Sequence, residues 1–76
     1  MTHYEILFYN GWIEPPAYYL IDDVDGETPE QALALNLDRL IGEVRNKFGL
    51  DESAQGRIRE SLYIVREGGM LSARER

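Results

Sequence analysis

The sequence predicts an α+β fold in which a small sheet of 3–4 strands packs against one long helix. The N-terminal half holds apolar runs of strand length separated by turn residues. A long stretch from Pro29 to about Phe48 then has the apolar period of an α-helix. After position 60 the chain returns to β-branched and aromatic residues. The predicted order is β-β-α-(short α)-β, with a further C-terminal strand as an option.

The first predicted strand covers residues 3–9. Alternate residues of a strand lie on opposite faces, and here both faces are largely apolar. The two sets are Tyr4, Ile6 and Phe8 on one face, and Glu5, Leu7 and Tyr9 on the other. We therefore expect this strand to lie inside the sheet rather than at its rim.

An irregular connection is expected between the first two strands, over residues 10–16. Asn10-Gly11 is a strong turn signal, and Pro15-Pro16 cannot donate hydrogen bonds to a neighbouring strand. The second predicted strand covers residues 17–24. Strict alternation along it gives two sets of side chains: Tyr18, Leu20, Asp22 and Val24 on one face, and Tyr19, Ile21 and Asp23 on the other.

The long helix has clear signals at both ends. Thr28 is a good N-cap, Pro29 suits the first helical position, and Gln31 can complete a capping box. Gly49 suits the left-handed residue that ends many helices. One apolar face is formed by six residues: Leu33, Leu37, Leu40, Ile41, Val44 and Phe48. Leu35 lies off this face.

The C-terminal third predicts a short helix followed by a strand. Asp51 or Ser53 can cap a helix that ends near Glu60, and residues 61–67 have strand composition. Gly68-Gly69 is a candidate two-residue hairpin turn. Two alternatives follow for the end of the chain: residues 70–74 return as a fourth strand, or residues 69–76 form a flexible tail.

Length and composition indicate one small domain, residues 1–76. The chain has no cysteine and one histidine, which excludes disulfides and the usual zinc spacings. No apolar run approaches the roughly 18–20 residues that cross a bilayer, and no signal pattern is present. We therefore expect a cytoplasmic protein with no membrane association and no cofactor. At this length the hydrophobic core is small, so self-association is a common way to bury more apolar surface.

Charge is unevenly distributed along the chain. Residues 1–38 contain eight acidic side chains and no lysine or arginine, so this half carries −8. All eight basic residues lie from Arg39 onward with six acidic ones, which gives that half +2. A net charge of −6 disfavours nucleic acid as a partner. The asymmetry is suited to steering a partner of complementary charge or orienting two copies; chance and solubility also explain it.

Motifs for catalysis or metal binding are weak. The segment 22–27 is rich in carboxylates, and Asp23, Asp25 and Glu27 match calcium-loop positions when Gly26 takes the glycine position. The closing acidic ligand would then be Ala32, which breaks the pattern. The serines lack a nucleophile-elbow context, and no phosphate-binding glycine loop is present. We therefore expect a protein that is not an enzyme and holds no metal.

The strongest candidate for a functional surface is the aromatic segment of the N-terminal half. One helix covers one face of a sheet, so the other face is expected to be bare and to present Tyr and Trp side chains, which are enriched at interfaces. The residues expected in or near this contact are Tyr9, Trp12, Ile13, Tyr19 and Ile21. The alternative is that the second helix or the tail covers this face.

Two functional hypotheses follow. The first is a small acidic protein-interaction module that forms a homodimer and binds a further protein partner. The second comes from a resemblance: residues 17–41, with strand residues followed by Thr28-Pro29-Glu30-Gln31-Ala32-Leu33, resemble the strand and helix opening of HicB-type antitoxin domains. That resemblance implies a regulatory protein whose acidic half neutralises a basic partner. The segments 12–16 and 22–27 depart from the HicB-type pattern.

Overall fold

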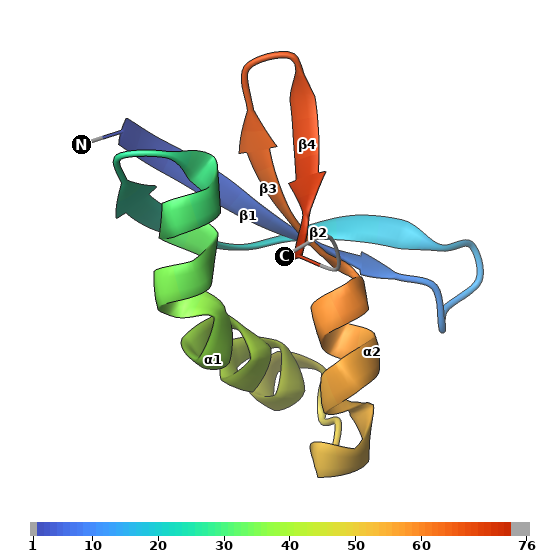
Figure 1. Cartoon of the computed structure of the whole chain (residues 1–76). Helices are drawn as coiled ribbons and strands as arrows, with labels where there is room; N and C mark the ends of the chain where they lie inside the picture. The colour runs from blue at the N-terminus through green and yellow to red at the C-terminus, as the bar shows by residue number, and fades with distance from the viewer. Residues whose placement is uncertain (1, 74–76) are drawn as a thin grey trace.

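The computed structural model describes residues 2–73 and has the predicted α+β architecture (Figure 1). In chain order its elements are β1 (Thr2–Asn10), β2 (Ala17–Gly26), α1 (Pro29–Phe48), the 3-10 helix η1 (Glu52–Ala54), α2 (Gln55–Glu60), β3 (Leu62–Arg66) and β4 (Gly69–Ser72). The predicted order is confirmed, and the optional fourth strand is present. The helix α1 begins at Pro29 and ends at Phe48, as predicted.

The four strands form one antiparallel sheet in the order β2-β1-β3-β4. β1 pairs with both β2 and β3, which confirms that the first strand lies inside the sheet. β2 and β4 are therefore the two edge strands. Figure 1 shows α1 and α2 on one side of the sheet, with the β3–β4 hairpin projecting away from them.

The ends of α1 are fixed by local hydrogen bonds and backbone geometry. The Gln31 N–H donates to Thr28 Oγ1 at 3.1 Å, and the Glu27 N–H donates to Gln31 Oε1 at 3.0 Å. This is a capping box in which the reciprocal bond reaches one residue before the cap. Gly49 ends the helix with φ of 66°, a conformation that glycine adopts without steric cost.

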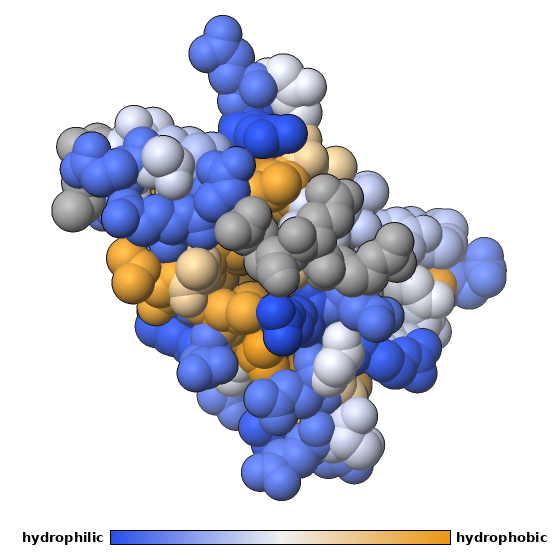
Figure 2. All heavy atoms as spheres, in the orientation of Figure 1, coloured by the Kyte–Doolittle hydropathy of each residue, from blue (hydrophilic) through white to orange (hydrophobic). Residues whose placement is uncertain are grey.

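The hydrophobic core lies between the sheet and the two helices. From α1, the predicted face contributes Leu33, Leu40, Ile41 and Val44 as buried residues, with Leu37 and Phe48 packed at its margin. The sheet and α2 contribute the remaining large buried side chains: Ile6, Phe8, Val24, Ile58, Leu62, Ile64 and Leu71. Figure 2 shows hydrophobic side chains in the middle of this view, between α1 and α2, with hydrophilic residues around them. Leu35 is 75% exposed, as its place off the apolar face predicts.

A β-bulge in β2 overturns the strict alternation expected for that strand. Ile6 pairs with Asp22 and Leu7 with Leu20, so Ile21 is an extra residue with no partner on β1. Val24 faces the core, but the bulge at Ile21 reverses the alternation of faces for the residues that precede the bulge in β2. Tyr19 and Ile21 therefore lie on the helix side, and Tyr18 and Leu20 lie on the opposite side.

At the C-terminal end the structure favours the strand over the tail. Residues 69–72 pair with β3, and Ala73 is fully buried. Arg66 pairs with Gly69, so the hairpin turn is Glu67-Gly68, one residue earlier than predicted. Residues 74–76, the rest of the segment considered as a tail, lie outside the described residues.

Candidate interaction surface

The side of the sheet opposite α1 and α2 carries a continuous apolar surface, which we call the open face. All four strands contribute to it: Leu7 and Tyr9 from β1, Tyr18 and Leu20 from β2, Tyr63 and Val65 from β3, and Met70 from β4. Cross-strand pairing makes these side chains neighbours, since Leu7 pairs with both Leu20 and Tyr63 and Val65 pairs with Met70. Within residues 2–73, both helices pack on the other side of the sheet (Figure 1).

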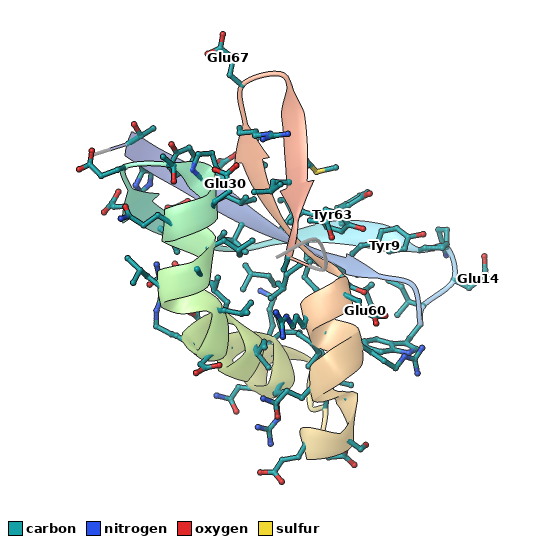
Figure 3. The ribbon with its side chains drawn as sticks, in the orientation of Figure 1. Tyr9, Glu14, Glu30, Glu60, Tyr63 and Glu67 are labelled. Carbon is teal, nitrogen blue, oxygen red and sulfur yellow. The ribbon has the colours of Figure 1, made fainter. Side chains whose placement is uncertain are left out.

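Three tyrosines form the centre of the open face. The Tyr9 and Tyr18 ring centroids are 4.9 Å apart, and those of Tyr18 and Tyr63 are 5.9 Å apart. Figure 3 shows Tyr9 and Tyr63 on the side of the sheet away from the helices. Tilted and edge-on ring contacts at these distances stabilise an aromatic cluster beyond the burial of its surface.

The outer part of the open face is substantially exposed to solvent. Tyr18 is 50% exposed, Leu20 is 55% exposed and Met70 is 42% exposed. Single exposed apolar side chains are ordinary, but here they adjoin the half-buried Leu7, Tyr9, Tyr63 and Val65. A contiguous apolar patch of this kind is typical of a contact surface.

The amino end of β1 gives the open face a charged border. His3 Nδ1 lies 2.8 Å from Asp25 Oδ1, and His3 Nε2 lies 3.3 Å from Asp23 Oδ2. Hydrogen bonding to Asp25, and then to Asp23, raises the pKa of His3 above its ordinary value. With Glu5 on the same side, this end of the sheet is acidic while the tyrosine end is uncharged.

Three strand residues were expected in this contact, and the structure places one of them on the open face. Tyr9 lies on the open face. The placement of Tyr19 and Ile21 on that face is wrong: the Tyr19 ring is 5.1 Å from the Phe48 ring of α1, and Ile21 packs against the core. The bulge at Ile21 is the physical reason. The prediction extended a strict alternation of faces from Val24 back along the strand, and the extra residue reverses that alternation for the residues before it.

The expectation that Trp12 lies beside the open face is also wrong. Its ring is 6.0 Å from that of Phe8, a fully buried residue on the helix side, and the Arg57 guanidinium of α2 stands 4.6 Å from its ring centroid. The Trp12 N–H donates to Asn10 Oδ1 at 3.0 Å. Trp12 thus connects the loop of residues 11–16 to α2 through a cation–π contact. Ile13, 38% exposed, lies in the same loop.

Sequence reasoning missed five members of the open face: Tyr18, Leu20, Tyr63, Val65 and Met70. The position of Tyr63 and Val65 can be predicted from the sequence. They alternate with Leu62 and Ile64, which are the better candidates for the core, so Tyr63 and Val65 are expected on the opposite face. The position of Tyr18 and Leu20 cannot be predicted in this way, because the bulge depends on pairing with β1.

The aspartates of the segment 22–27 lie in β2 and not in a loop, and their carboxylates contact other parts of the fold. Asp22 accepts a hydrogen bond from Arg39 of α1, which also donates to Glu43, while Asp23 and Asp25 contact His3. Hydrogen bonding to Arg39 lowers the pKa of Asp22, whereas burial raises the pKa of Glu43.

Residues 2–73 contain no group of three or more His, Cys, Asp or Glu side chains arranged to hold a metal ion, and that part of the chain has no pocket. None of the helices it contains is long and apolar enough to span a membrane. Comparison of the chain with protein-family models, curated proteins and solved structures finds no match.

Proposed function

We propose that this protein is a small, non-enzymatic interaction module that self-associates through the open face. The observation that supports the proposal is the continuous apolar surface on the side of the sheet opposite α1 and α2, where the Tyr18 ring contacts both the Tyr9 ring and the Tyr63 ring. The proposed setting is the cytoplasm, where a chain without cysteine needs no oxidising environment.

Physical chemistry favours a contact at this surface. Tyrosine and methionine are enriched in interface cores, and lysine and glutamate are depleted there. The described part of the open face has no lysine or arginine, and its acidic residues lie at one end. Removing its exposed apolar area from water stabilises an assembly by about 25 cal/mol per Å², before the costs of association.

A matched pair of variants tests the proposal. Leu20→Glu places a charge on the open face, and Leu35→Glu makes the same change at a more exposed leucine of α1. Sedimentation equilibrium at tens of micromolar is expected to return twice the 8.8 kDa monomer mass for the native chain and for Leu35→Glu, and a lower mass for Leu20→Glu. A monomer mass for the native chain would refute self-association.

The acidic N-terminal half supports a second candidate, an antitoxin-like regulatory protein that neutralises a basic partner. Its three strand aspartates, Asp22, Asp23 and Asp25, lie together in the edge strand β2. Charges at an exposed edge steer an oppositely charged partner and make its binding dependent on salt. A pull-down from the native host at low and high salt distinguishes the two: a basic protein released by salt favours neutralisation, and its absence favours the self-associating module.

A further inference from the structure

β2 is the longest strand and lies at the edge of the sheet. Its ten residues pair with β1 on one side, and among residues 2–73 no strand pairs with its outer side. An edge of this length presents a row of backbone N–H and C=O groups to any strand that can approach. Natural edge strands are often protected against such pairing by charges, proline or bulges.

In β2 this protection covers only one half of the strand. Residues 17–21 carry no charge, and the three aspartates Asp22, Asp23 and Asp25 follow them. On the other side, Pro15-Pro16 precede the strand and donate no hydrogen bond. The edge with neither charge nor proline is therefore the segment of residues 17–21, which ends at the bulged residue Ile21.

The bulge further restricts how two copies of this edge can pair. Residues opposite each other in an antiparallel pair must lie on the same face of the sheet. Ala17, Tyr19 and Ile21 lie on the helix side, and Tyr18 and Leu20 lie on the open face. A two-fold axis at Tyr19 satisfies this rule along residues 17–21, and the bulged residue Ile21 lies at the end of the paired segment.

We propose that two copies of this chain pair antiparallel through the outer edge of β2, about a two-fold axis at Tyr19. Tyr18 then lies opposite Leu20 of the second copy, and Ala17 lies opposite Ile21. Asp22 and Asp23 come to lie beside the prolines of the second copy, so no aspartate opposes another. The proposal rests on the proposed self-association and places its contact at the outer edge of β2, where Tyr18 and Leu20 are the residues of the open face that take part.

Edge pairing would join two four-stranded sheets into one continuous sheet. The open faces of the two copies would then form a single surface, on which the exposed Tyr18 and Leu20 pack across the junction. Backbone hydrogen bonds between the two β2 strands stabilise the dimer, and the side-chain pairs determine the register of one strand against the other. Tyrosine and methionine farther from the junction stay accessible to a further protein partner.

Single-cysteine variants test the register directly, because the native chain has no cysteine. Directly opposed Cβ atoms lie about 4.5–5.5 Å apart, close enough for a disulfide after small adjustments. Tyr19→Cys is therefore expected to give mostly a disulfide-linked dimer under mild oxidation. Asp25→Cys is the control: this exposed residue is six positions from the axis, which separates its two copies by roughly 40 Å.

Two further measurements, one on the native chain and one on Met70→Glu, test the proposal even if Tyr19→Cys fails to fold. Amide hydrogen exchange of the native chain is expected to slow with protein concentration at residues 17–21 and to stay unchanged at residues 23–26. Met70→Glu, on the open face but at the opposite edge strand, is expected to keep the native dimer mass.

The outcomes separate the two proposals. A native dimer that lacks both the Tyr19→Cys crosslink and the concentration-dependent protection would overturn edge pairing and leave self-association intact. Loss of the dimer in Met70→Glu would also overturn edge pairing, in favour of two open faces buried against each other. A native monomer would overturn both proposals.

Discussion

Gly26, at the end of β2, lies directly against Ala32 in α1. A Cβ added at position 26 would stand 2.7 Å from the Ala32 Cβ and 2.9 Å from its Cα. The backbone at Gly26 has no positive φ, so the requirement for glycine here is one of space. This close approach brings the start of α1 down onto the edge strand.

Gly26→Ala is therefore expected to destabilise the fold by about 1–3 kcal/mol, because either α1 or the end of β2 must move. The control is Gly42→Ala in α1, where nothing lies within 4 Å of the added Cβ. That variant is expected to gain about 1 kcal/mol from helix propensity. Thermal melts of both variants check the prediction, and equal shifts in the same direction would contradict it.

Leu40→Ala tests the apolar face of α1. Leu40 is fully buried, so its truncation is expected to lower the free energy of unfolding by about 2–5 kcal/mol, enough to unfold most of the protein. Leu35→Ala, in the same helix but at a 75% exposed residue, is expected to change it by less than about 0.5 kcal/mol. Circular dichroism and denaturant titration compare them; similar midpoints would show that Leu40 is not a core residue.

Features set by local sequence were predictable, and α1 is the clearest case. Thr28, Pro29, Gln31 and Gly49 act within one turn of the chain, and the apolar period of the helix needs no knowledge of its partner. The third strand follows from composition in the same way. These signals were sufficient for the fold class and the element order.

Features set by pairing between strands were not predictable. The bulge at Ile21 exists because β1 and β2 adopt a register that leaves this residue without a partner. One extra residue moves every side chain before it to the other face, which is why Tyr19 and Ile21 were misplaced. Trp12 was misplaced for a related reason: its neighbour Arg57 is distant in sequence and belongs to α2.

Arg39 donates hydrogen bonds to two carboxylates whose pKa values are shifted in opposite directions. Its hydrogen bond lowers the pKa of Asp22, so the folded state gains from the charged form of that carboxylate. Burial, together with Asp22 nearby, raises the pKa of Glu43, so the charged form of that residue opposes folding. At pH 7, Asp22→Asn is expected to lower the melting temperature.

Glu43→Gln is the matched variant, and it is expected to leave the melting temperature unchanged or raise it. Both effects are expected to stay below about 1 kcal/mol, since all three side chains are partly exposed to solvent. The Asp22 contribution is present above its unfolded pKa and fades as the pH falls through its lowered folded pKa. Equal losses of stability in both variants at pH 7 would contradict this assignment.

His3 provides a direct test of the charged border, because it is the only histidine in the chain. Its pKa is raised by hydrogen bonding to Asp25 first and to Asp23 second, so its imidazole signals in an NMR titration are expected to give a pKa above 6.5. Asp25→Asn is expected to lower that pKa more than Asp23→Asn does. Since the folded pKa is raised, this contact contributes stability below the unfolded pKa and loses it as the pH rises through the folded pKa. His3→Gln is expected to abolish that pH dependence; an unshifted His3 titration in the native chain would show that the two aspartates do not hold the ring.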